Sequence, residues 1–303
     1  MLMFAGGNLG GVRMAVRHGV LILLVPCLWF STAASQTEPN AFPPPHSDVP
    51  LYRQNLFARI FRDQPMLVTE WFPRQLTTPG LGSGLFVTTL LAANSHTGGI
   101  DLRLERSFDQ AGGRGANGWA STFTSLGNSP VEVLGLGLGW LSARWSGNTR
   151  LEEATSLSAQ ALADAGLWVI VLKEVTHRAR PMLDENGKFF SDAPHQVHSF
   201  PSGHAMDAFA IASVFSGVYR EHRWVPWVTF GTAGLIGVSR VTLGRHFPSD
   251  VAVGAMLGTS IGHFVVHQSR EDEEDGPVSF LREVHPYVDP ETHGAGLMFR
   301  HTW

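Results

Sequence analysis

Cysteine is almost absent from this chain, since Cys27 is the only one among 303 residues. A single cysteine cannot form a disulfide within the chain, so the fold must be held together without one. Charged residues are also scarce, at 16%, and they sum to a net charge of −4 at pH 7. This balance provides no basic surface of the kind that binds nucleic acid, and nucleic acid is therefore not an expected partner.

The sequence also lacks the alternation of apolar and polar residues that marks half-buried strands, and no segment repeats at a fixed interval. It has instead a series of apolar stretches with helical spacing, separated by intervals rich in Gly, Asn, Pro and charge. They cover residues 51–62, 81–94, 131–145, 153–177, 204–220, 225–241 and 249–267. This pattern predicts an all-α fold, a helical bundle of about six core helices. The glycine-rich stretch 112–130 matches no phosphate-binding loop and is predicted to be a flexible loop.

The N-terminus has the composition of an export signal. Arg13 and Arg17 precede the short apolar run 19–30, and the small residues 31–35 then offer a cleavage site. A signal peptide predicts an exported protein, periplasmic or extracellular, and an uncleaved membrane anchor is the alternative. The predicted domains are the signal peptide 1–35, a proline-rich linker with a short amphipathic helix at 36–79, the helical domain 80–268 and a polar C-terminal tail 269–303.

Two arrangements of the apolar stretches remain open, a soluble bundle and a set of membrane spans. Several stretches are only about 14 to 17 residues long, whereas a span needs about 20 apolar residues. Asp164 and Asp207 interrupt two of them. If a signal peptide is cleaved, three crossings would place the end of the stretch 153–177 in the cytoplasm, and that end begins a group of polar segments that an exported protein would be expected to carry outside. A soluble bundle avoids this conflict and is favoured, while an integral inner-membrane protein with an outward-facing site is the alternative.

Three short segments carry residues that suit phosphate chemistry, and the first runs from Lys173 to Pro181. Lys173 and Arg180 are seven residues apart, which on a helix places them two turns apart on nearly the same face. Both cations can therefore reach one anion, with Pro181 helping to end the helix. Taken alone, the pair also fits a solvated helix end.

The second segment, Ser199 to His204, reads SFPSGH. Ser202 is a natural N-cap, and Gly203 permits close approach of the backbone to a ligand. Free backbone N–H groups make the start of a helix an anion site. His204 in that first turn would stand beside the anion as a proton donor or acceptor. The alternative is an ordinary capped helix with a surface histidine.

The third segment, Ser239 to Asp250, reads SRVTLGRHFPSD. Arg240 offers a planar fork for two phosphate oxygens. Pro248 favours a helix start, so Asp250 is predicted to lie in the first turn and to reach back to His246. A carboxylate that holds one imidazole nitrogen leaves the other free to attack. The alternative is a structural His–Asp pair that stabilises a turn.

Together the three segments resemble the type 2 phosphatidic acid phosphatase (PAP2) and vanadium haloperoxidase superfamily. Its pattern is K-x6-R-P, then P-S-G-H, then S-R-x5-H-x3-D, and every named position is present between Lys173 and Asp250. The resemblance implies a helical bundle in which the three segments gather at one end.

The resemblance also implies a metal-independent phosphatase. His246 would attack phosphorus and form a phosphohistidine, Asp250 would orient it, and His204 would protonate the leaving alkoxide and later activate water. The implied phosphate-binding residues are Lys173, Arg180, Ser202, Gly203 and Arg240. No cofactor is implied, because three fixed cations replace a metal ion. His263 and His267 lie four residues apart without a visible third ligand, so no metal site is predicted there.

The identity of the substrate and the reaction class stay open at this stage. The same pocket would suit a vanadium-dependent haloperoxidase with vanadate as cofactor, although known members of that branch tend to be longer. A non-catalytic helical envelope protein is a further alternative. The expected partner is a phosphorylated small molecule or lipid, with possible membrane association and no expectation for the oligomeric state. Specificity is assigned to the loops 98–130 and 182–200.

Overall fold

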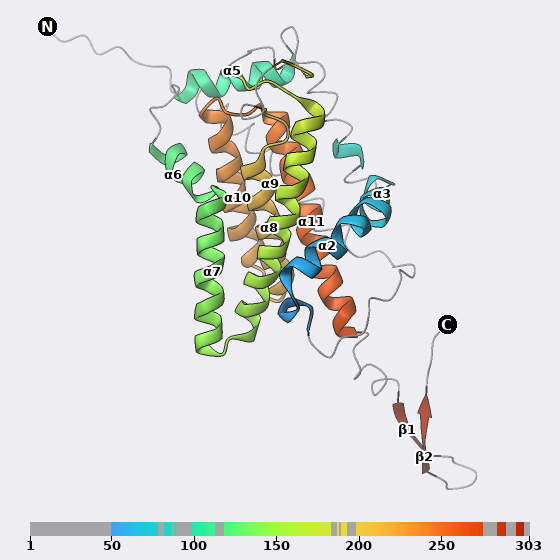
Figure 1. Cartoon of the computed structure of the whole chain (residues 1–303). Coiled ribbons are helices and arrows are strands. Elements are labelled where there is room, and N and C mark those ends of the chain that lie inside the picture. Colours follow the sequence, from blue (N-terminus) through green and yellow to red (C-terminus); the bar gives the residue numbers. More distant parts are fainter. Residues whose placement is uncertain are drawn as a thin grey trace, which may run out of the picture.

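A computed structural model describes residues 50–77, 82–85, 88, 99–112, 118–182, 187, 189–192, 198–274, 284–288 and 295–299. Long helices form a bundle, and shorter helices lie around it (Figure 1). The all-α bundle expected from the sequence is confirmed. The predicted signal peptide and the first part of the linker, residues 36–49, lie outside the described residues. So does most of the stretch 81–94, of which 82–85 and 88 are helical.

Five long helices make up the bundle. They are α7 (Ser129–Ser146), α8 (Thr149–Thr176), α9 (Gly203–Val218), α10 (Val225–Thr242) and α11 (Pro248–Glu274). Several of these helices begin at residues that favour a helix start. Proline stands in the first turns of α7 and α10, and at the start of α8 the Asn148 side chain accepts a hydrogen bond from the Leu151 N–H at 3.0 Å. Gly147, at φ 71°, ends α7 in the left-handed conformation. Helix α11 continues to Glu274, so the first residues of the predicted tail are helical.

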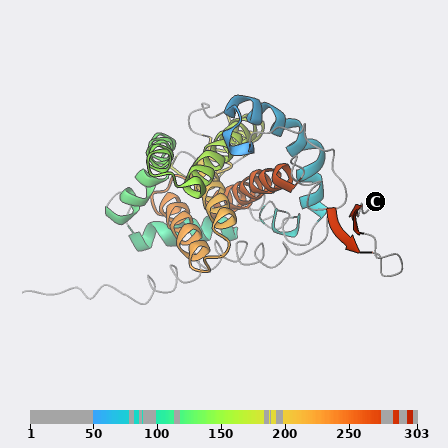
Figure 2. The same cartoon turned by 90° about the horizontal axis from the view of Figure 1, so that it is seen from below.

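Helix α9 contacts α8, α10 and α11, and Figure 2 shows the bundle from below. Its contact with α11 is close because α11 carries glycine at every fourth position, at 254, 258 and 262. A Cβ atom at these positions would collide with the backbone carbonyl oxygens of Ser202, Met206 and Ala210, respectively. This close packing fixes the start of α9 against the start of α11.

The N-terminal part of the described chain covers one side and one end of the bundle. The segments η1 (Leu51–Arg53), α2 (Leu56–Met66), η2 (Leu67–Trp71) and α3 (Phe72–Thr77) run along the side formed by α8 and α11, and α5 (Ile100–Gly112) crosses one end (Figure 1). Helix α6 (Gly118–Leu126) leads into α7 and packs on α10.

Three sequence predictions were wrong. Residues 98–130 were expected to form a loop, yet Ile100–Gly112 form α5, whose buried Asp101 accepts hydrogen bonds from Arg178 and Ser249. The stretch 112–130, expected to be a flexible loop, contains α6, because Phe123 packs on a cluster with α10 residues and Thr124 lies 2.9 Å, oxygen to oxygen, from Ser239. Such distant contacts leave no local pattern. The C-terminal region was expected to lack strands, yet β1 (Val284–Val288) and β2 (Ala295–Phe299) pair antiparallel, with Val284 opposite Phe299. Each strand has five residues, too few to show a clear alternation.

Large apolar side chains point outward from three of the long helices. Helix α8 and residues 248–271 of α11 have the length and hydropathy of membrane spans, but 89% of the α11 window is buried inside the bundle. The outward-facing residues lie mainly on α7, α8 and α10. They include Val133, Leu134, Leu138, Leu141 and Trp145 of α7, Ile170, Val171 and Val175 of α8, and Trp227 and Val228 of α10.

Candidate active site

The eight predicted site residues lie on helix ends at the end of the bundle that α5 crosses (Figure 1). Lys173 lies in the last turn of α8, and Arg180 lies just beyond that helix. The start of α9 holds Ser202, Gly203 and His204. Arg240 lies in the last turn of α10, His246 in the turn that follows, and Asp250 in the first turn of α11. Lys173, Arg180, Arg240 and His246 all interact electrostatically with His204. The structure therefore brings side chains from all three segments to one place.

His246 is buried, with 2% of its surface exposed, and the hydrogen bond of its Nδ1 atom defines its tautomer. Nδ1 lies 2.7 Å from the backbone carbonyl oxygen of Ser199. A carbonyl oxygen only accepts hydrogen bonds, so Nδ1 carries the proton and Nε2 of the neutral ring carries a free lone pair. The carboxylate of Asp250 lies 3.7 Å from the same Nδ1. Burial lowers the pKa of His246 to about 4, Asp250 opposes this shift, and the charges of Arg240 and Lys173 add to it.

Asp250 is fully buried and is held in place by two donors. Its Oδ1 accepts a hydrogen bond from Nη1 of Arg178 at 2.5 Å, and its Oδ2 accepts one from the backbone N–H of Phe247 at 2.8 Å. The sequence led us to expect Asp250 beside His246, and the structure places it there. It also shows that the Ser199 carbonyl, to which no role was assigned, makes the shorter contact with the imidazole.

Arg178 is the hub of this buried network and was missed in the sequence. Its Nη1 also donates to Ser249 Oγ at 2.8 Å, and its Nη2 donates to Asp101 Oδ2 at 2.7 Å. The guanidinium lies 4.2 Å from the ring centre of Phe247. Asp101 in turn accepts a hydrogen bond from the backbone N–H of Ser249 at 2.9 Å. Burial raises the pKa of Asp101, and the nearby Arg178 opposes the rise.

The start of α9 has the anion-binding geometry that the sequence suggested, with one difference. Ser202 occupies the N-cap position, but its hydroxyl makes no capping hydrogen bond. Its backbone N–H donates to the Asp250 carbonyl oxygen at 3.0 Å and ties α9 to α11. The backbone N–H groups of the first turn have no acceptor within the helix, as at any helix start. Asp207, one turn on, accepts a hydrogen bond from Ser129 at 3.1 Å and so joins α9 to α7.

Arg240 is positioned by α6, the helix that the sequence did not reveal. Its Nη1 donates to Thr124 Oγ1 at 3.2 Å. Thr124 also lies within hydrogen-bonding distance of the Ser239 hydroxyl, at 2.9 Å. The last turn of α10 is thereby fixed to α6, and the guanidinium has a defined orientation.

Three of the eight candidate site residues carry a buried polar atom that has no hydrogen-bond partner within the described part of the chain. These atoms are Nε of Arg180, Nε of Arg240 and the hydroxyl oxygen of Ser202. Buried donors without acceptors are rare and costly, so each needs a partner from a ligand or from solvent. Burial lowers the pKa of Arg180, and the neighbouring Arg245 adds to this effect. A bound oxyanion would satisfy the donors and offset the crowding of positive charge.

No group of three or more His, Cys, Asp or Glu side chains with metal-binding geometry occurs among the described residues. The rings of His263 and His267 both pack near Trp71, with ring centres 5.7 and 5.6 Å away. Metal independence stays a prediction.

Comparison with known proteins agrees with this geometry. Residues 155–274, which include all eight site residues, match the family model described as the PAP2 superfamily. This part of the chain, which is less than half of it, is therefore similar to PAP2 superfamily proteins.

Proteins similar to this chain include phosphatases with lipid substrates in their names. The lipid A 1-phosphatase of Rhizobium johnstonii is 35% identical over 99 residues, which cover 31% of this chain and 39% of that protein. The phosphatidylglycerophosphatase B of Bacillus subtilis is 29% identical over 191 residues, covering 56% and 84%. A crystal structure of LpxE from Aquifex aeolicus is 27% identical with a TM-score of 0.46, covering 57% of this chain and 98% of that one. The chain thus spans well under half the length of the first of these relatives.

Two residues that support the site lie outside the matched PAP2 segment. Asp101 belongs to α5 and Thr124 to α6, and they reach Arg178 and Arg240, respectively. Neither carries a recognisable motif. Arg178 and Ser199, by contrast, lie inside or beside the family motifs. Arg178 stands among other charged residues, Lys173, Glu174 and Arg180, so no feature of the sequence singled it out.

Proposed function

We propose that this protein is a phosphatase that hydrolyses phosphate monoesters or lipid (di)phosphates through a phosphohistidine on His246. One observation carries the proposal. Three buried donors without partners lie on Arg180, Arg240 and Ser202, at the same end of the bundle as a histidine whose Nε2 is unprotonated. A phosphoryl group supplies oxygens for the donors and an electrophile for the nitrogen.

In the first step, the lone pair of His246 Nε2 forms a bond to phosphorus. The bond between phosphorus and the ester oxygen breaks, and the leaving oxygen takes a proton from His204, whose imidazolium form the negative charge of the bound phosphate stabilises. The imidazole becomes positively charged, and the Asp250 carboxylate, 3.7 Å from Nδ1, stabilises that charge. The Nδ1–H stays bonded to the Ser199 carbonyl, which keeps the ring in place.

In the second step, His204 takes a proton from a water molecule, whose oxygen attacks phosphorus. The bond between phosphorus and Nε2 breaks, its electron pair returns to the ring, and inorganic phosphate is released. The net reaction converts ester and water to alcohol and phosphate. Lys173, Arg180 and Arg240 stabilise the negative charge on the non-bridging oxygens, a task that a metal ion performs in other phosphatases. No metal ion is therefore required in this scheme.

We further propose a lipid substrate, with the bundle embedded in a membrane. The soluble arrangement favoured from the sequence would leave the outer faces of α7, α8 and α10 in water, an unfavourable exposure of apolar surface. Helix α7, with 18 residues, is about 27 Å long at 1.5 Å per residue, close to the ~30 Å of a bilayer core. The candidate site at the bundle end would then lie near the membrane surface, where lipid phosphates are found. The lipid-named phosphatases among the relatives support this assignment.

Phosphate release by the purified full chain in mild detergent tests the proposal. The substrates are p-nitrophenyl phosphate, phosphatidic acid and undecaprenyl diphosphate, each measured with and without EDTA. We expect turnover that EDTA leaves intact and that His246→Ala lowers by at least about 10³-fold, because the nucleophile is lost. His222→Ala, at an exposed histidine between α9 and α10, is the matched control and should retain activity.

Three outcomes would contradict the proposal. Activity that EDTA removes and magnesium restores would exclude the metal-independent mechanism. Halide oxidation by the vanadate-loaded protein with peroxide, without ester hydrolysis, would indicate a haloperoxidase. Binding of phosphate without turnover of any ester would indicate a non-catalytic protein.

A further inference from the structure

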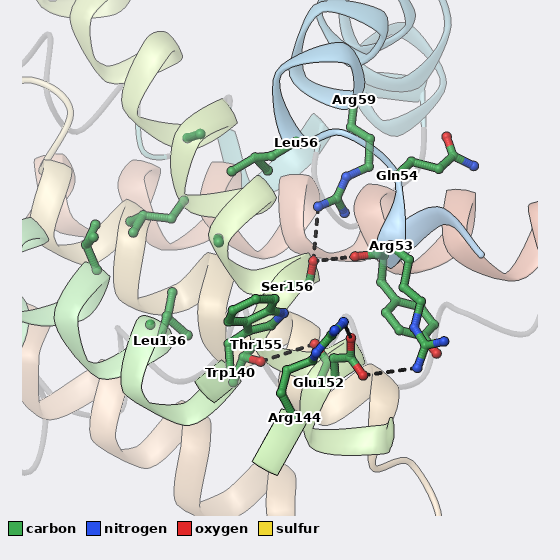
Figure 3. Close-up of a pocket in the computed structure, with 16 residues that line it drawn as sticks. Arg53, Gln54, Leu56, Arg59, Leu136, Trp140, Arg144, Glu152, Thr155 and Ser156 are labelled. Atoms are coloured by element: carbon green, nitrogen blue, oxygen red, sulfur yellow. Dashed lines mark hydrogen bonds and ion pairs between the residues drawn. The ribbon is translucent and has the colours of Figure 1, made fainter. Parts of the chain in front are cut away.

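A groove of about 810 Å³ lies between α7 and α8, beside the N-terminal segment η1 and the start of α2 (Figure 3). None of the eight candidate site residues lines it. Its α8 wall comes from the first half of that helix, whereas Lys173 and the candidate active site lie at the other end. The volume falls within the roughly 300–1,000 Å³ of small-molecule sites. The groove is therefore a second cavity, separate from the candidate active site.

Most of the groove wall is apolar. Leu136 and Trp140 of α7 face Leu162 of α8 across it, and small residues at Gly137 and Ala159 leave the space between the helices open. The α7 residues that line it recur at helical spacing from 133 to 144, which corresponds to a length of about 16 Å. A slot of this length and lining suits a hydrocarbon chain.

One end of the groove is positively charged. Figure 3 shows Arg53 and Arg144 reaching Glu152 from opposite sides, with nitrogen–oxygen distances of 3.1 and 3.0 Å. The side chain of Glu152 is only 6% exposed, whereas those of Arg53 and Arg144 are 43% and 54% exposed. One carboxylate is thus shared by two guanidinium groups, each of which keeps further N–H donors accessible.

The balance of charge in the lining favours an anion. At its charged end the two exposed arginines, Arg53 and Arg144, share the single carboxylate of Glu152, which leaves a net charge of +1. The Arg144 guanidinium also lies over the Trp140 ring, 5.4 Å from its centre, at the junction between the charged end and the apolar wall. Trp and Arg at such a junction are typical of a membrane–water interface.

We propose that this groove binds an anionic phospholipid of the surrounding bilayer. One acyl chain lies between α7 and α8, and the phosphate group contacts Arg53 and Arg144. Because the wall is apolar and the charged end carries a net positive charge, the groove selects an anionic over a zwitterionic headgroup. The inference rests on the proposed membrane setting but not on phosphoryl transfer, since the bound lipid is a phosphodiester and is not consumed.

Two glycines of α7 provide the sharpest test. A Cβ atom at either Gly137 or Gly135 would meet no atom within 4 Å, but only Gly137 lines the groove. Gly137→Leu therefore fills the groove, and Gly135→Leu adds the same side chain outside it. The delipidated full chain in detergent, with orthovanadate present to occupy the candidate active site, is titrated with dioleoyl phosphatidylglycerol or dioleoyl phosphatidylcholine. Native mass spectrometry counts the bound lipids.

We expect one tightly bound phosphatidylglycerol in the wild type and in Gly135→Leu, and its loss in Gly137→Leu. Arg144→Gln and Arg53→Gln should each weaken binding about tenfold, the value of one charge-assisted hydrogen bond. Arg223→Gln removes an exposed arginine between α9 and α10, outside the groove, and should leave binding unchanged.

Equal affinity for phosphatidylcholine would overturn the proposed headgroup selection. Equal binding by both leucine variants would overturn the site itself. Absence of any bound lipid in the wild type would also overturn it, because the groove would then be closed to lipid. This experiment measures lipid binding, whereas the proposed function is tested by phosphate release. The lipid-binding proposal can therefore fail while the wild-type protein still releases phosphate, and the reverse.

Discussion

Two buried arginines show how one kind of side chain can serve two purposes in this fold. Arg178 lies at the catalytic end and Arg59 lies between α2 and α8; they are 0% and 3% exposed. Arg59 donates to Gln160 at 2.7 Å and to Ser156 at 3.0 Å, and Gln160 donates to Asp63 of α2. That network joins α2 to α8 and ends there.

The network around Arg178 reaches the candidate active site instead. Arg178 holds Asp250, whose carboxylate lies beside His246, and Asp101 holds Arg178 from the opposite side. Both networks contribute to stability by the same physics, because an unpaired buried charge is costly in either place. The difference lies in what each network orients. We therefore expect the two arginines to be separable by kinetics but not by stability.

The largest expected effect is a loss of stability in two single variants, each of which removes one of the two guanidinium groups. Arg178→Ala and Arg59→Ala should each lower the free energy of unfolding by about 3–5 kcal/mol, because each leaves buried polar partners unmatched. Only Arg178→Ala should also lower kcat, by roughly 10²-fold, because Asp250 is no longer held against His246. Chemical unfolding and phosphate release measure the two effects on the same samples.

Arg178→Lys sharpens this result. Lysine keeps the charge but cannot donate to Asp250, Ser249 and Asp101 from one planar group, so we expect partial recovery of stability and little recovery of kcat. A kcat that falls equally in the Arg59 and Arg178 variants would show that the Arg178 network has only a structural role.

A smaller effect concerns the acid side of the pH profile. Burial lowers the pKa of His246 to about 4, so the imidazole stays neutral and nucleophilic down to that pH rather than to its ordinary value of 6.5. We expect kcat/KM to fall tenfold per pH unit only below about pH 4. Asp250→Asn should lower the pH at which kcat/KM begins to fall, because the carboxylate raises the pKa of His246. Arg59→Ala should leave that pH unchanged. A wild-type kcat/KM that already falls below about pH 6.5 would contradict the lowered pKa of His246.

The smallest effect is expected at α6. Thr124→Val removes the acceptor for Nη1 of Arg240, and we expect KM to rise about fivefold, the equivalent of one hydrogen bond of about 1 kcal/mol. Thr122→Val, on the exposed face of the same helix, is the matched control. An equal change in both variants would mean that α6 does not position Arg240.

The bundle could be predicted because its signals are local. Apolar periodicity marks α7 to α11, and Pro, Asn and Gly mark several of their ends. The three motifs likewise identify the helix ends that meet. What could not be predicted depends on distant partners: Asp101 contacts Ser249, 148 positions away, and Thr124 contacts Arg240, 116 positions away. No spacing rule connects such pairs, so α5 and α6 were taken for loops.

The motifs also gave no role to some residues within a segment, since K-x6-R-P names Arg180 and leaves Arg178 unassigned. Arg178 and Arg180 are two residues apart, yet the first is buried in ion pairs with Asp101 and Asp250, while the second keeps an unpartnered Nε. The backbone turns sharply at His177, which has a φ of 45°, and the two side chains leave it toward different partners. Sequence alone gives no reason to assign Arg178 a task of its own.

The central claim is tested most directly by trapping the covalent intermediate. With ³²P-labelled p-nitrophenyl phosphate as substrate, His204→Ala should slow the second step more than the first, because p-nitrophenolate leaves without a proton whereas no base activates water. Phosphoryl groups should therefore accumulate on the protein during turnover. The account predicts a base-stable, acid-labile label on the peptide that contains His246, and no label in the His204→Ala/His246→Ala double variant. A label on another residue, or turnover by His246→Ala at the wild-type rate, would contradict it.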